Sequence, residues 1–121
     1  MASTKHTESR HTGEHVVSEA NGARSREQGI LASGNLAAGT VLALNGDGDY
    51  VPLAPGAADG TEVAKAVLYG AVDASDGPQP CTVHVRACEV EEAALGWPDG
   101  ITEPQTSTAL NDLIGVGIIP R

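Results

Sequence analysis

The stretch CTVHVRACEV, residues 81–90, decides the fold more clearly than any other part of the sequence. Alternate residues of a β-strand point to opposite faces of its sheet. One face then carries the apolar set Cys81, Val83, Val85 and Ala87, and the other carries the mixed set Thr82, His84, Arg86 and Cys88. The alternation therefore predicts one continuous strand over residues 81–90, with a packed face and a wetter face.

Upstream of this stretch, short apolar runs alternate with turn residues. Strands are predicted over residues 29–32, 40–44 and 49–53, and the intervening NGDG, residues 45–48, is typical of a tight hairpin turn. Pro52 lacks a backbone N–H, which favours an edge strand or a strand end. Residues 63–69 are predicted as a buried strand, with a helix as the alternative. The loops are residues 54–60 and 75–80.

Downstream, the sequence predicts one helix and a last short strand. TEPQ, residues 102–105, has the form of a capping box with a proline in the first helical turn. An apolar stripe on one helix face follows, and it comprises Ala109, Leu110, Leu113 and Ile114. Gly115 or Gly117 would end this helix, and residues 118–119 would form a strand before Pro120.

Composition indicates one domain with a thin core. The 121 residues include no Phe, one Trp and two Tyr, so Val, Leu, Ile and Ala must fill the interior. Each such side chain contributes only about 1.5–3 kcal/mol when it is fully buried. We therefore expect oligomerisation or partner binding to supply part of the stability. Trp97 fits either a core or an interface.

Charge is distributed unevenly and excludes several classes of partner. The formal net charge is −9, yet residues 1–27 are neutral as a group. The remainder has only Lys65, Arg86 and Arg121 as basic residues against twelve acidic ones. Such a domain repels nucleic-acid backbones and anionic lipid. The sequence also shows no apolar run of membrane-span length and no signal-peptide core, so we expect a soluble protein made in the cytoplasm.

The cysteines and histidines are candidates for chemistry, but each has a simpler structural explanation. On one extended strand, Cys81 and Cys88 would lie about 23 Å apart, too far for a disulfide, so reduced thiols are expected. A Cys–His nucleophile built from Cys88 or Cys81 and His84 is disfavoured, because residues four apart on a strand do not touch. The spacing of His6, His11 and His15 fits no common metal site, and solvated histidines are expected.

The aspartates favour turn chemistry over metal binding. Five of them lie in or near turns: Asp47, Asp49, Asp59, Asp73 and Asp76. No segment matches the twelve-residue calcium loop, and residues 46–48 do not open a helix as a phosphate cradle would. No combination of nucleophile, base and oxyanion donor is found. We therefore expect no enzyme activity, no cofactor and no metal.

The order of short motifs along the chain resembles the head decoration protein family of tailed phages, the lambda-like capsid stabilisers. The resemblance covers residues 16–121 and rests on the series SREQG (25–29), LAAGTVL (36–42), YVPL (50–53), ADG (58–60), AVLY (66–69), AVDA (71–74), VHVR (83–86), EV (89–90), LGWP (95–98) and GIIPR (117–121). It implies a mostly β fold with short helices, of the β-clip type, and a homotrimer at the three-fold positions of an expanded capsid. There it would bind the major capsid protein on the outer surface of the virion and stabilise the shell against packaged DNA.

The resemblance also implies a two-part chain. Residues 1–26 are expected to form a flexible, capsid-docking arm, and residues 27–121 a single β-rich decoration domain. Residues 1–14 have too little apolar surface to order themselves, whereas Val16 and Val17 favour a strand that joins a sheet edge. The docking residues are expected to be Val16, Val17, Ser18, Ser25 and Arg26. A small ligand- or partner-binding β-module and a small hydrolase using His84 or Cys88 are the alternatives.

Overall fold

The computed structural model describes residues 11–121 as a mostly β domain with short helices, which confirms the predicted fold class. Expectations for residues 1–10, including His6, lie outside the described residues. The strands are β1 Val16–Glu19, β2 Arg26–Leu31, β3 Gly34–Leu36, β4 Val41–Leu44, β5 Tyr50–Pro52, β6 Ala66–Leu68, β7 Val72–Ala74, β8 Gln79–His84, β9 Cys88–Val90 and β10 Ile118–Pro120. The helices are η1, a 3₁₀ turn at Glu92–Ala94, and α1 at Glu103–Gly115.

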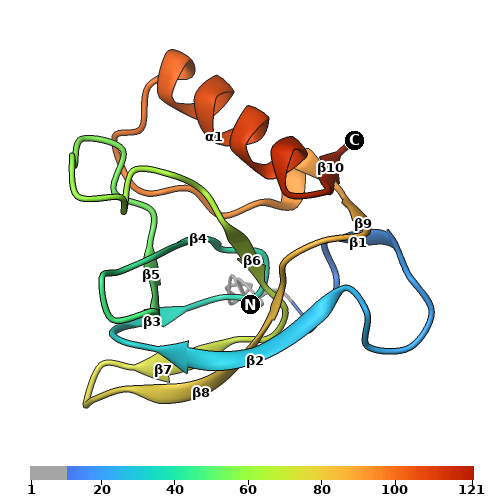
Figure 1. Ribbon diagram of the computed structural model, residues 1–121, viewed down its shortest axis with the longest axis horizontal. Coiled ribbons are helices and arrows are strands. Elements are labelled where there is room, and N and C mark those ends of the chain that lie inside the picture. The colour runs from blue at the N-terminus through green and yellow to red at the C-terminus, as the bar shows by residue number, and fades with distance from the viewer. Residues whose placement is uncertain (1–10) are drawn as a thin grey trace, which may run out of the picture.

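A closed barrel of five strands forms the centre of the domain, in the order β2-β5-β4-β6-β8 (Figure 1). The longest pairing joins β2 and β8 antiparallel, from Arg26 opposite His84 to Leu31 opposite Gln79. Hairpin β4–β5 turns at residues 45–48, where Asn45 Oδ1 accepts hydrogen bonds from the backbone N–H groups of Asp47 and Asp49. The predicted turn is therefore confirmed, and Pro52 lies at the end of β5, as its missing N–H requires.

The core has two apolar clusters, one on each side of the strands β4 and β6. Inside the barrel lie Leu31, Leu42, Tyr50, Ala66, Leu68, Ala74, Cys81 and Val83. The second cluster fills the space under α1 and includes Val41, Ala43, Val67, Leu113 and Ile118. Successive residues of β4 and β6 therefore enter different clusters, because side chains alternate across a strand. Both faces are buried, which explains the continuous apolar runs in these two strands.

A three-stranded sheet in the order β1-β9-β10 lies beside the C-terminal end of α1 (Figure 1). Strand β1 pairs antiparallel with β9, and β10 pairs parallel with β9 on the other side. Helix α1 buries Ala109 and Leu113 as predicted, but Ile114 is 49% exposed. The expected apolar stripe is therefore narrower than the sequence indicated.

The predicted continuous strand over residues 81–90 is wrong. The chain leaves β8 after His84, and Ala87 adopts a left-handed conformation with φ of 53° before β9 begins in the other sheet. This irregular step changes which residues face inward: Val85 is half-buried, whereas His84 and Cys88 are buried. Two side chains of the expected wetter face, His84 and Cys88, are therefore buried.

The expected boundary between arm and domain at residue 26 also differs from the structure. Residues 11–26 pack on the domain: Gly13 N–H donates to the carbonyl of Tyr69, and Glu91 N–H donates to the carbonyl of His15. Arg26 begins β2 of the barrel. Val16 and Val17 do form a strand, as predicted, but its partner is β9 of the same chain.

The capping box of α1 predicts a measurable loss of stability when it is removed. Thr102 Oγ1 accepts from the Gln105 N–H, and the Gln105 side chain accepts from the Thr102 N–H. Thr102→Ala is expected to lower the free energy of unfolding by about 1 kcal/mol, since an N-cap replaced by alanine leaves a helical N–H without its acceptor. Urea denaturation measures the change.

Thr108→Ala is the matched control on the same helix. Its hydroxyl donates to the Pro104 carbonyl, which already lies within the helix, and the side chain is exposed. This substitution is expected to change stability by less than about 0.5 kcal/mol. An equal loss in both variants would contradict the capping argument.

Candidate functional site

The five expected docking residues divide into an exposed group and a buried group. Val17 is 57% exposed, Ser18 is exposed and Val16 is half-buried, all in β1. Ser25 is fully buried and Arg26 is half-buried. Ser25 therefore cannot contact a partner directly, and its role is inside the domain.

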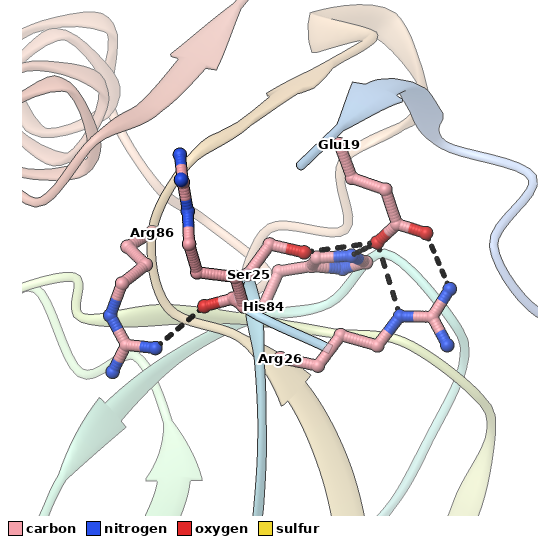
Figure 2. Close-up of polar contacts among 6 residues, drawn as sticks. Glu19, Ser25, Arg26, His84 and Arg86 are labelled. Atoms are coloured by element: carbon pink, nitrogen blue, oxygen red, sulfur yellow. Dashed lines mark hydrogen bonds and ion pairs between the residues drawn. The ribbon is translucent and has the colours of Figure 1, made fainter. Parts of the chain in front are cut away.

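The buried group meets at the carboxylate of Glu19, a residue that the sequence reasoning missed (Figure 2). Glu19 Oε2 accepts from Ser25 Oγ at 3.1 Å and from Arg26 Nε at 3.1 Å, while Oε1 accepts from Arg26 Nη2 at 2.5 Å. His84 Nε2 lies 2.6 Å from Oε2, where it must donate because a carboxylate only accepts. One carboxylate thus ties the end of β1 to β2 and β8.

These donors make Glu19 a persistent anion. The hydrogen bonds from Arg26 and then from His84 lower its pKa from 4.5 to about 2, against a smaller opposing effect of burial. The carboxylate is therefore ionised at every physiological pH. We call Glu19, Ser25, Arg26 and His84 the Glu19 anchor, since together they fix β1 to the barrel.

Aromatic rings pack around the Glu19 anchor. The Arg26 guanidinium lies 4.0 Å from the centroid of the Tyr69 ring, and the Tyr69 and His84 rings meet edge to face at 5.2 Å. His15, just before β1, packs edge to face on His84 at 6.0 Å. His15 is fully buried, so the prediction of a solvated histidine is wrong for this residue; His11 is exposed.

A second polar group lies next to the anchor, at the loop between β1 and β2 (Figure 2). Arg86 Nη1 donates to the carbonyl of Arg24 at 2.8 Å. Arg86 Nη2 also pairs with Glu27 Oε1 at 2.5 Å. Arg24 is exposed, and no ion pair of its side chain is found within residues 11–121. The exposed Arg24 therefore lies next to the ion pair of Arg86 and Glu27, in a chain whose net charge is −9.

The remaining candidate sites lack the chemistry that they would need. Cys81 and Cys88 are free and buried, and burial raises the pKa of Cys88 to about 11, which disfavours a reactive thiolate. Asp59 and Asp73 accept hydrogen bonds from Thr61 and Ser75 two residues ahead, which is turn chemistry. Within the described residues, no three metal-ligating side chains come together.

The hollows on the described surface are open. One lies between α1 and the preceding loops and is lined by Leu53, Pro55, Glu62, Pro104, Gln105 and Thr108. Another is lined by Glu92, Ala93, Leu95, Trp97 and Arg121, where Trp97 is half-buried and also packs on the core. Polar side chains line both hollows, but neither hollow encloses a ligand-sized space as a typical small-molecule site does. No helix in residues 11–121 has the length and apolar character to cross a membrane.

Comparison with protein families matches residues 5–118 to the family described as bacteriophage lambda head decoration protein D. The match covers almost the whole chain, including β1, the Glu19 anchor and all five barrel strands. A comparison with curated proteins found no match.

Proposed function

Because the chain belongs to the bacteriophage lambda head decoration protein family, we propose that it forms a homotrimer on the outer surface of an expanded phage capsid. The family consists of structural capsid proteins and not of enzymes, and membership places the chain among phage capsid-binding proteins. The family match over residues 5–118 is the observation that carries the proposal. The three-fold positions, contact with the major capsid protein and stabilisation against packaged DNA are its finer parts.

The charge and the core of this chain support the proposal. A net charge of −9 disfavours capture of the packaged genome, which suits a protein that coats a DNA-filled shell. A core without Phe leaves stability to be gained by association. Many copies that bind only the expanded lattice shift the shell toward that form, since a ligand stabilises the state that it prefers.

Strand β1 is the docking element that the geometry supports best. Val17 is the most exposed large apolar side chain in the described residues, and β1 is an edge strand of the sheet β1-β9-β10. An edge strand offers main-chain groups that pair with an extended segment of another protein. The docking surface is therefore Val16–Glu19, while Ser25 and Arg26 support it from inside.

The test of this proposal is co-sedimentation of the purified protein with undecorated, expanded heads of the phage that encodes it. We expect saturable binding with three copies per three-fold position, and size-exclusion chromatography with light scattering to give three times 12.3 kDa. Decorated heads should resist heating and DNA release better than bare heads. Absence of binding to expanded heads would contradict the proposal.

A pair of surface variants tests the docking strand within the same assay. Val17→Gln is expected to weaken capsid binding at least tenfold, because three strands per trimer multiply a small loss at each contact. Ile114→Gln on α1 changes a side chain of similar exposure, 49% against 57%, and should bind like the unaltered protein. The free energy of unfolding of each variant should stay within about 0.5 kcal/mol of that of the unaltered protein, since neither side chain is buried. Equal capsid binding by both would refute the role of β1.

A further inference from the structure

We propose that Asn21 is a site of spontaneous deamidation in the folded protein, and that the loop between β1 and β2 carries the resulting aspartate or isoaspartate without loss of the fold. The reaction needs only water, so this inference goes beyond the proposed function and does not depend on it. A glycine directly follows two of the four asparagines in the chain, at Asn21–Gly22 and Asn45–Gly46. The structure treats these two pairs very differently.

The chemistry is the same at any Asn–Gly pair. The backbone nitrogen of the glycine loses its proton and attacks the side-chain carbonyl carbon Cγ of the asparagine. An N–Cγ bond forms, the Cγ–Nδ2 bond breaks, and the amide nitrogen leaves as ammonia with the transferred proton. Water then opens the succinimide ring at either carbonyl, which gives aspartate or isoaspartate. Glycine favours ring closure because it has no Cβ and adopts many backbone conformations.

Asn21 lies where ring closure meets little resistance. Residues 21–24 are exposed in the loop that projects from the domain between β1 and β2 (Figure 1). Within residues 11–121, no hydrogen bond holds the Asn21 side chain or the Gly22 N–H. A Cβ placed on Gly22 would meet nothing within 4 Å, so the backbone has space to turn as the ring forms.

Asn45 has the same neighbour but is held on all sides. Its Oδ1 accepts hydrogen bonds from the N–H groups of Asp47 at 2.9 Å and Asp49 at 3.0 Å. Its own N–H donates to the Asp49 carbonyl, and its carbonyl accepts from the Gly48 N–H. Ring closure would turn the side-chain amide out of this turn and break these bonds, so Asn45 should react at least about tenfold more slowly than Asn21.

The other two asparagines lack both favourable features. Asn35 precedes a leucine and lies in β3, which is paired with β7. Asn111 precedes an aspartate and lies inside α1. A side chain on the following residue and a hydrogen-bonded backbone both oppose ring closure, so Asn21 is expected to be the first asparagine to react.

The loop has room for the product. Isoaspartate adds one methylene group to the backbone between β1 and β2, and the loop is attached near its two ends. Ala20 N–H donates to the Ala87 carbonyl, next to β1. Arg26 N–H donates to the Ala23 carbonyl, next to β2. The Glu19 anchor should therefore stay in place, while the new carboxylate, ionised near neutral pH, makes the chain one charge more negative than −9.

Ageing of the purified full-length protein in mildly alkaline buffer tests the inference. Folded protein and a parallel sample unfolded in guanidinium chloride are followed by ion-exchange chromatography, and the modified residue is identified by peptide mapping with mass spectrometry. Trypsin separates residues 11–24 from residues 27–65, so Asn21 and Asn45 fall in different peptides. Isomerisation at Asp–Gly pairs changes neither charge nor mass and does not enter the measurement.

The unfolded sample provides the reference rates. Asn21 and Asn45 should react within about threefold of each other there, since each precedes a glycine in a free backbone. In the folded protein, the first acidic species should map to Asn21, with Asn45 at least about tenfold slower. Reaction of Asn45 first, or of both at one rate, would overturn the inference. So would a folded protein that stays intact while the unfolded sample loses both asparagines.

A pair of substitutions assigns the reaction independently of the mapping. Asn21→Gln should remove the first acidic species, because glutamine would have to close a larger ring, which forms much more slowly. Asn111→Gln changes another exposed asparagine and should leave that species unchanged. An acidic species that persisted in Asn21→Gln would place the reaction elsewhere and overturn the assignment.

The deamidated form, separated by ion exchange, tests whether the loop carries the product. Its urea midpoint and its hydrogen exchange over residues 11–20 should match those of the unaltered protein. Faster exchange confined to that segment would show that the added methylene group loosens the Glu19 anchor, and it would overturn this part of the inference while leaving Asn21 as the site.

Discussion

Gly29→Ala is expected to lower the free energy of unfolding by about 2–3 kcal/mol, although it adds a single methyl group. A Cβ at position 29 would lie 2.6 Å from Cε2 and 2.9 Å from Cδ2 of the Tyr50 ring. Tyr50 is only 7% exposed and belongs to the cluster inside the barrel, so its ring has no free space to move into. Overpacking of this kind costs about 1–3 kcal/mol, sometimes more.

Two comparisons isolate the clash from the general effect of replacing glycine. Gly46→Ala lies in the β4–β5 turn, where an added Cβ meets nothing within 4 Å, so stability should change by less than about 1 kcal/mol, toward greater stability. In a Tyr50→Leu background, Gly29→Ala should cost less than half as much, because the smaller side chain leaves room for the methyl. Urea unfolding of Gly29→Ala, Gly46→Ala, Tyr50→Leu and the Gly29→Ala, Tyr50→Leu double variant measures these changes in stability. Equal costs in both backgrounds would contradict the steric explanation.

The features that the sequence predicted correctly are those with local causes. The capping box at Thr102, the turn that begins at Asn45 and the helix end before Gly117 depend on hydrogen bonds or backbone conformations within a few residues. Gly117 has φ of 91°, as expected of a residue that follows a helix. Such signals can be recognised without knowledge of the remaining fold.

The break after His84 was missed because its cause is not local. Apolar and polar residues alternate from Cys81 to Ala87, and neither Ala87 nor Cys88 is a residue that marks a turn. Its left-handed conformation, φ of 53°, allows residues 88–90 to pair with β1 and β10 instead of continuing β8 along β2. Strand pairing across the whole chain outweighs the local preference of alanine.

The anchor was missed for a related reason. Glu19 and His84 are 65 residues apart, and nothing in the sequence near either residue indicates the other. Residues 11–26 contain few apolar side chains, which is typical of a disordered segment, yet here polar groups hold the segment on the domain. The amino-acid composition of a segment indicates how much apolar surface it can bury. It does not show which polar side chains pair with distant residues in a network of this kind.

Glu19→Gln is expected to reduce both the stability of the domain and the dependence of that stability on pH. The pKa of Glu19 is about 2 in the folded protein and 4.5 in its reference state, so the unfolded chain binds the proton more readily. Its contribution is therefore fully present above about pH 4.5 and is lost as the pH falls toward 2. Because the Glu19 side chain is 24% exposed and water partly screens it, the contribution is about 1–2 kcal/mol, less than the whole shift implies.

Urea unfolding at pH 7, 4.5, 3.5 and 2.5 measures this contribution directly. The unaltered protein should exceed Glu19→Gln most at pH 7, and the difference should shrink steadily below pH 4.5, because protonation removes the same charge that the substitution removes. Glu89→Gln is the matched control: hydrogen bonds from Ser18 and Arg121 also lower the pKa of Glu89, but its partners lie at the surface. The difference in stability between the unaltered protein and Glu89→Gln should therefore be smaller at every pH. A gap between the unaltered protein and Glu19→Gln that stayed constant down to pH 2.5 would show that shape and packing hold β1, and not the charge of the anchor.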